Sequence, residues 1–363
     1  MTLLGQALAR RGTDVEYPAV PAPGRAVALG WVGAGLVAVL GSVVLSTLVV
    51  GWQNEVRANV DMPARDSAEL VPFLTVWVLT AAAGLGLLHG FGAVAQRCGA
   101  AARRRGAHRT VAAVVAGLGA GAVLLLLVVL VVGGALVVVD RSFAARDATT
   151  PNSITEPDSR WRSAGPDSPV RWEALGMQGR AFVGGGPSPA QIEEVTGRPA
   201  RSPVRVYVGL EQAASAQERA ALAVAELRRT GGFEREVLVV ATPTGSGWLE
   251  RQAVDTVEYL NAGNTAIVAT QYSYRPSWYS FLFTPDLPRD SSRALFDAVH
   301  TEWERLPVGE RPELVVYGLS LGASGMQSVF GDIAAMTART DGAVFTGPPN
   351  NAQPWRTLQE SRD

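Results

Sequence analysis

The stretch that decides the fold is Arg311-Pro-Glu-Leu-Val-Val-Tyr-Gly-Leu-Ser-Leu-Gly-Ala323. Its apolar residues from Leu314 to Tyr317 predict a buried strand, and the residues after it are compatible with a helix. Between strand and helix lies a Gly-x-Ser-x-Gly turn at Gly318, Ser320 and Gly322. This order is the sequence form of a nucleophile elbow, a tight turn that presents a serine hydroxyl at the edge of a sheet.

The elbow predicts a chemical role for Ser320. In such a turn the serine hydroxyl is a nucleophile, and the backbone N–H of Leu321 points to where an oxyanion forms. The motif alone is weak evidence, because Gly- and Ser-rich chains contain it by chance. The flanking strand and helix favour the nucleophile over the alternative, a plain strand-to-helix turn.

Strands and helices alternate from about Arg201 onwards. The pattern predicts strands at Val204–Leu210, Val237–Ala241, Ala266–Gln271, Leu314–Tyr317 and Ala343–Thr346. It predicts helices at Ser215–Thr230, Glu250–Leu260, Asp290–Arg305 and Ala323 to about Arg339, the first opened by a capping box. Strands separated by helices form a mostly parallel sheet with helices on both faces, so this part of the chain is predicted to be α/β.

Ligand sites in parallel sheets lie beyond the carboxyl ends of the strands. Two loops are expected to meet the elbow there, Thr242–Trp248 and Tyr272–Tyr279. In the first, Gly245 or Ser246 fits the second oxyanion donor, because glycines let a backbone N–H approach the substrate; an ordinary turn is the alternative. In the second, the aromatic side chains either line an acyl pocket or pack over the sheet edge; they are Tyr272, Tyr274 and Trp278.

An activated serine needs a base, usually a histidine held by a carboxylate, and in the α/β-hydrolase order both follow the serine. The three histidines, His89, His108 and His300, all precede Ser320. His300 lies before the elbow strand, so we expect it at the opposite end of the sheet. No triad acid and histidine pair is found after Ser320, and we expect a sheet that is incomplete because the sequence is C-terminally truncated or degenerate.

Composition excludes several other functions. The net charge is −1, which gives no sign of a nucleic-acid partner, and all 32 basic residues are arginine. Without lysine the chain has neither Schiff-base chemistry nor a P-loop. The single cysteine, Cys98, excludes an intrachain disulfide framework and a cysteine-based zinc cluster. No metal or cofactor is implied.

Three apolar runs fill the first 140 residues, at 26–52, 70–95 and 111–139. Each exceeds the ~20 residues with which a helix crosses a bilayer. His89 lies inside the second run. Its side chain is expected either to make a polar contact between helices or to act as a functional group inside the membrane. Arginines between the second and third runs place that loop in the cytoplasm, so the chain after Asp140 lies outside it.

These features divide the chain into three parts. Residues 1–140 are predicted to form a multi-pass α-helical transmembrane domain. Residues 141–170 are polar, rich in Pro, Ser, Asp and Arg, and without apolar periodicity, which is typical of a linker. Residues 171–363 are predicted to form an α/β-hydrolase-like domain that lacks its last strands.

The sequence resembles the actinobacterial membrane-anchored alpha/beta-hydrolase family, in which a multi-pass N-terminal domain precedes a hydrolase domain. The resemblance runs from about Ala26 to Asp363 and is carried by Val204–Leu210, Thr242–Trp248, Gln271–Trp278, Gly318–Ala323 and Gly347–Pro349. It implies Ser320 as the nucleophile and a bacterial plasma-membrane location. The chain departs from the family pattern in three places. The elbow has Leu319 where the pattern carries an acidic residue, the hydrolase half stops early, and the family begins with a further membrane helix at the N-terminus.

We therefore predict a plasma-membrane serine hydrolase whose catalytic domain faces outward. It would act on an ester or thioester, such as a lipid or cell-envelope acyl group, through an acyl-enzyme at Ser320. The alternative is a non-catalytic envelope protein that keeps the elbow for folding and binds a ligand or partner. A transporter-like protein is a third, weaker possibility, because the spans are few and carry little charge.

Overall fold

The computed structural model describes residues 25–59, 64, 80, 84, 86, 90, 92–97, 99–101, 103, 104, 106 and 108–361. The chain divides into two units, Met1–Val132 and Gly133–Asp363. The second unit contains both the sheet and the elbow.

Among the described residues, two helices are long and apolar enough to cross a membrane. They are α2 (Arg25–Ala58), with its candidate span at Val39–Ala58, and α4 (Arg109–Asp147), with its span at Thr110–Asp147. Large apolar side chains of both helices are exposed, Leu45 by 63% and Leu118 by 70%. The predicted run at 70–95 lies mostly outside the described residues. The length and composition of the described helices therefore hint at membrane association.

The second unit is built on a parallel five-stranded sheet. Its strands are β1 (Val204–Val208), β2 (Val237–Thr242), β3 (Thr265–Thr270), β4 (Glu313–Leu319) and β5 (Gly342–Thr346). They are ordered β1-β3-β2-β4-β5, and every neighbouring pair is parallel. This confirms the α/β-hydrolase-like parallel sheet that the alternating pattern predicted.

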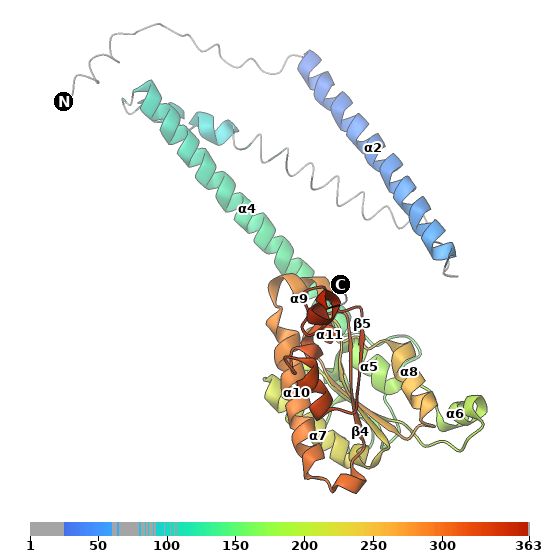
Figure 1. Ribbon diagram of the computed structural model, residues 1–363. Helices are drawn as coiled ribbons and strands as arrows, with labels where there is room; N and C mark the ends of the chain where they lie inside the picture. Colours follow the sequence, from blue (N-terminus) through green and yellow to red (C-terminus); the bar gives the residue numbers. More distant parts are fainter. Residues whose placement is uncertain are drawn as a thin grey trace, which may run out of the picture. The chain divides into compact units, whose positions relative to one another are not determined.

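Helices cover both faces of the sheet (Figure 1). On one face α7 (Ala216–Arg229) packs against α10 (Asp286–Arg305), and both contact the strands. On the other face lie α5 (Gly176–Gly184) and α8 (Arg251–Leu260). The shorter elements are α6 (Pro189–Thr196), α9 (Ser277–Phe283), α11 (Leu321–Gln327), α12 (Ile333–Arg339), α13 (Trp355–Glu360) and the 3-10 turns Trp172–Leu175, Leu210–Gln212, Gly232–Glu234 and Val308–Glu310.

The predicted capping box opens α7. The Ser215 hydroxyl accepts a hydrogen bond from the Glu218 backbone N–H at 3.1 Å, and the Glu218 carboxylate accepts one from the Ser215 N–H at 3.0 Å. Both bonds satisfy N–H groups that a helix start otherwise leaves unpaired. Gly231 follows with a left-handed φ of 66°, which ends the helix.

The predicted single helix from Ala323 to Arg339 is two helices, α11 and α12. The break includes Gly331, whose φ of 71° is incompatible with a continuing helix. Asp332 then caps α12 by accepting the Ala335 N–H at 2.7 Å. The expectation of one continuous helix is therefore wrong.

The polar stretch expected as a linker packs on the second unit. Arg162 forms a parallel β-bridge with Arg205 on β1, and Ala164 and Val170 are part of the buried core. The Arg162 guanidinium donates to the carbonyls of Val183, at 2.7 Å, and Gly185. Arginine-to-carbonyl contacts of this kind hold an irregular segment without the apolar periodicity that sequence patterns detect.

Candidate active site

The elbow turn has the strained backbone that its motif predicts. Ser320 stands between the end of β4 at Leu319 and the start of α11 at Leu321, with φ 52° and ψ −118°. A positive φ is uncommon for a residue with a side chain and costs about 1–3 kcal/mol, so it persists only where the surrounding structure enforces it. Such strain is typical of a serine presented for chemistry.

Close backbone packing requires both glycines of the turn. A Cβ on Gly318 would lie 2.6 Å from the Ala323 Cα, and one on Gly322 would lie 2.3 Å from the Thr242 carbonyl oxygen. No real Cβ approaches backbone atoms so closely. The contact of Gly322 also places the start of α11 directly against the carboxyl end of β2.

The Ser320 side chain is half-buried, and its hydroxyl has no hydrogen-bond partner among the described residues. Its backbone N–H donates to the Thr346 carbonyl on β5 at 2.8 Å, which fixes the turn to the sheet. Within the same described part, the Leu321 N–H makes no hydrogen bond. A hydroxyl and an adjacent N–H without partners are available to a reacting carbonyl group.

The Thr242–Trp248 loop lies beside the elbow, because Thr242 pairs in register with Gly318. The two candidate second donors differ. The Gly245 N–H donates to the Tyr272 hydroxyl at 2.7 Å and is therefore occupied. For the Ser246 N–H, no acceptor occurs among the residues that the structure describes. Of the two candidates, Ser246 is thus the one whose N–H is not engaged within the described residues.

The three aromatic residues of the second loop lie in different surroundings. Tyr272 is 2% exposed, and burial raises the pKa of its phenol well above the ordinary value. Tyr274 donates from its hydroxyl to the Asp140 carboxylate at 3.0 Å. Trp278 is 54% exposed on α9. Tyr272 therefore supports the loop, and only the other two have free surface.

A small cavity of about 170 Å³ lies between the end of α4 and these loops. It is lined by Phe143, Arg146, Asp147, Met177, Gln178, Ser246, Tyr274 and Pro276. The cavity brings together Ser246 and Tyr274, two of the residues predicted for the site, but neither Tyr272 nor Trp278 lines it. Its wall includes the last turns of α4, of which Phe143, Arg146 and Asp147 fall in the stretch expected as a linker.

Two family models match the chain over almost its whole length. The alpha/beta-hydrolase family model matches residues 204–363, and the alpha/beta-hydrolase family N-terminus model matches residues 1–187. The chain belongs to the alpha/beta-hydrolase family. Comparisons with curated proteins and with solved structures gave no match. In this hydrolase-family chain, the elbow follows the carboxyl end of β4, and the Thr242–Trp248 loop follows that of β2.

No histidine of this hydrolase-family chain is seen at Ser320 among the residues that the structure describes. His300 lies on α10, with its ring centroid 5.6 Å from that of Trp303, and the Trp303 indole donates to the Pro312 carbonyl just before β4. His300 is thus at the amino end of β4, as the sequence predicted, and burial lowers its pKa. His108 is exposed, and His89 lies outside the described residues.

The carboxylates that follow Ser320 have other partners. Asp332 caps α12, Asp341 accepts the Leu314 N–H at 2.8 Å near the amino end of β4, and Glu360 pairs with Arg356 at 2.7 Å. Asp363 lies outside the described residues. In the part of the chain that the structure describes, no cluster of His, Cys, Asp or Glu is suited to a metal ion.

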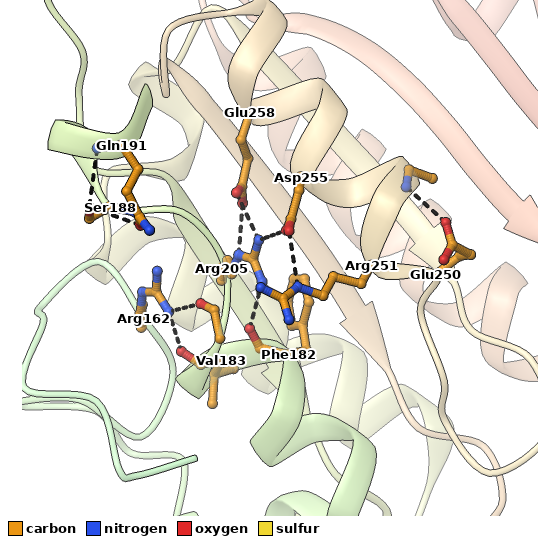
Figure 2. A network of polar contacts seen from close by, with 12 residues as sticks. Arg162, Phe182, Val183, Ser188, Gln191, Arg205, Glu250, Arg251, Asp255 and Glu258 are labelled. Carbon is orange, nitrogen blue, oxygen red and sulfur yellow. Dashed lines mark hydrogen bonds and ion pairs between the residues drawn. The ribbon is translucent and has the colours of Figure 1, made fainter. Parts of the chain in front are cut away.

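Sequence reasoning missed a buried ion network between β1 and α8 (Figure 2). The Arg205 guanidinium binds both oxygens of Glu258 at 2.7 Å and one oxygen of Asp255 at 2.6 Å, and it donates to the Phe182 carbonyl at 2.9 Å. Arg205 is 2% and Glu258 0% exposed. Desolvation raises the pKa of Glu258, and the Arg205 charge opposes that shift.

A sequence signal for this network existed. Arg205 interrupts an otherwise apolar strand, Val204–Val208, and Asp255 and Glu258 lie one helical turn apart on α8. A charged residue inside a buried strand needs an ionic partner. The spacing of the acids at i and i+3 supplies two on one helix face.

Proposed function

We propose that this protein is a membrane-anchored serine hydrolase that forms an acyl-enzyme at Ser320. Its substrate class would be an ester or thioester, including lipid or cell-envelope acyl groups. The single observation that carries the proposal is the Ser320 backbone, with φ 52° on a strand-to-helix turn whose two glycines admit no side chain. The match to the alpha/beta-hydrolase family supports it.

The proposed reaction begins with attack of the Ser320 oxygen on the acyl carbonyl carbon. The negative charge that develops on the carbonyl oxygen would be stabilised by the N–H groups of Leu321 and Ser246, which have no acceptor among the described residues. The bond between the carbonyl carbon and the leaving group breaks as the acyl-enzyme forms, and the proton of the Ser320 hydroxyl passes to the departing alcohol or thiol. Water then adds to the acyl carbon, the bond to the Ser320 oxygen breaks, and the proton from water restores the hydroxyl as the acid is released.

The proposed membrane anchoring rests on α2 and α4 and on the expected span at 70–95. In this topology the arginines between residues 97 and 109 lie in the cytoplasm and the sheet lies outside. An actinobacterial plasma membrane is the expected location. Tethering an esterase to a bilayer favours acyl substrates that are themselves part of the membrane or envelope.

The second candidate is a non-catalytic binding module of the same fold. The observation that favours the binding module is that the described residues provide no imidazole base near Ser320. Without a base, the oxyanion hole and binding leave only residual catalysis.

A fluorophosphonate probe distinguishes the two candidates. The full chain in detergent or membranes is treated with the probe, and labelling is compared among the unmodified protein, Ser320→Ala and Ser324→Ala. Ser324 is the matched control, since it lies one helical turn further along α11. Labelling that is lost only in Ser320→Ala supports the hydrolase. A folded protein that does not label, or labels equally in Ser320→Ala, contradicts it and favours the binding module.

A further inference from the structure

Helix α9 presents an exposed apolar surface. Of its residues, Trp278, Phe281, Leu282 and Phe283 are between 44% and 63% exposed, and Leu287 just after it is 40% exposed. We call these five residues the α9 patch. Contiguous exposed apolar side chains on a folded unit mark a surface that binds protein or membrane.

The α9 patch follows a loop that is tied to the end of α4. The Asp140 carboxylate accepts from Arg275 Nε at 2.6 Å and from the Tyr274 hydroxyl at 3.0 Å. The Arg275 guanidinium also lies over the Tyr279 ring, 4.8 Å from its centroid, so α9 itself joins this cluster. Arg275 is two residues from Ser277, where α9 starts, a reach of about 7 Å.

Asp140 marks the point at which α4 stops being apolar. The stretch from Thr110 to Val139 contains no charged residue. At a rise of 1.5 Å per residue it is about 45 Å long, which matches the roughly 40–45 Å of a bilayer with its headgroups. If α4 spans the membrane, Asp140 lies at the outer limit of the lipid headgroups. The start of α9 then lies within reach of the headgroup layer.

The residues around this point suit a lipid surface. Arg141 and Arg146 lie on the last turns of α4, where they can bind phosphate headgroups. The Arg141 side chain is exposed. The α9 patch contains a tryptophan and two phenylalanines, and aromatic rings, above all Trp and Tyr, favour the membrane–water interface. Arginines beside an apolar aromatic helix are the composition of a segment that lies in the interface.

We propose that α9 is an interfacial helix that inserts the α9 patch into the outer leaflet of the membrane that α4 crosses. This inference rests on the proposed membrane anchoring and adds the position of the candidate active site relative to the membrane. A Cβ on Gly245 would lie 2.5 Å from the Ser277 backbone nitrogen, so the start of α9 packs on the loop beside the elbow. Lipid contact at α9 therefore places the loops around Ser320 at the membrane surface, and the substrate is an amphiphile whose acyl group enters from the lipid.

Depth-dependent quenching tests the insertion in the full chain. A Cys98→Ser background carries a single cysteine at Leu282→Cys, labelled with the fluorophore NBD and reconstituted into phosphatidylcholine–phosphatidylglycerol vesicles with or without dibrominated acyl chains. Leu282 is 62% exposed, so the label does not disturb the core. Val308→Cys, 81% exposed just before β4, is the matched control, and Leu126→Cys in α4 reports anchoring.

We expect a blue shift and bromine quenching at positions 282 and 126 and neither at 308. Quenching at 126 with a solvent-like signal at 282 overturns the inference while the anchoring stands. A blue shift at 282 without quenching shows protein cover, such as a second copy, and overturns it too. Equal quenching at positions 282 and 308 also overturns the inference. An unquenched label at 126 refutes the anchoring itself.

Discussion

Replacing Arg205 by methionine tests the buried ion network of Figure 2. The guanidinium holds Glu258 through two bonds of 2.7 Å, and the carboxylate is fully buried. Methionine has a similar length but no charge. Glu258 would then keep its buried negative charge without its bidentate partner.

The expected cost is large. Removing one partner of a buried ion pair destabilises a protein by about 3–5 kcal/mol. In a domain of 150–250 residues each 1 kcal/mol lowers the Tm by about 2–4 °C, so Arg205→Met should lower it by about 6–20 °C. Arg251→Met is the matched control: Arg251 also pairs with Asp255, but it is 76% exposed, and its loss should cost at most about 1 kcal/mol.

The loss should depend on pH. Desolvation raises the pKa of Glu258, and Arg205 opposes that effect, so the variant has a still higher folded-state pKa. A carboxyl that binds its proton more tightly when folded loses stability as pH rises above its unfolded value, here 4.5. The Tm deficit of Arg205→Met should therefore grow from pH 5 to pH 8 and shrink toward pH 4.5.

Near-UV circular dichroism melts of the full chain in detergent at these pH values provide the measurement. The double variant Arg205→Met/Glu258→Met should recover much of the lost Tm, because two apolar side chains replace the ion pair. A deficit of Arg205→Met no larger than that of Arg251→Met, or a double variant less stable than either single one, would refute the reasoning.

Three further changes test the elbow and its loops. Gly322→Ala should abolish fluorophosphonate labelling and lower the Tm, since its Cβ meets a backbone oxygen at 2.3 Å and overpacking costs about 1–3 kcal/mol; unchanged labelling would contradict the described turn. Tyr272→Phe leaves the buried Gly245 N–H unpaired at a cost of about 1–3 kcal/mol, and a thermal melt that matches the unmodified protein would contradict that bond. His300→Asn should leave the labelling rate unchanged, because His300 lies at the amino end of β4; a large loss of rate would assign it a catalytic role.

Much of the sheet could be predicted from short-range patterns. The five strands were found within a few residues of their ends, because buried parallel strands are continuous apolar runs. The strained turn at Ser320 was predictable from its motif: Gly318 is required by a contact with Ala323 within the turn, although Gly322 is required by a contact with Thr242 on β2. Local features of this kind leave a local signature.

Features that depend on distant contacts could not be predicted. The engagement of the Gly245 N–H by Tyr272 joins residues on two loops, and nothing in either loop indicates it. The same holds for Asp140, which looked like the point where a polar linker begins and instead binds Arg275. Polar contacts across the fold follow from the packing of the strands, which fixes the loops only after the sheet has formed.

The backbone bridge between Arg162 and Arg205 has a consequence for how the chain can be divided. The two matched regions end and begin at residues 187 and 204, yet Val170 and Val206 lie in a single buried cluster. A fragment that begins at residue 204 would lack the segment around Arg162 that pairs with β1. It would also lack Phe182, so the buried guanidinium of Arg205 would be uncovered. The two regions should therefore be expressed together, and a useful excised fragment has to start upstream of Trp161, whose carbonyl accepts a hydrogen bond from the Arg205 N–H at 3.1 Å.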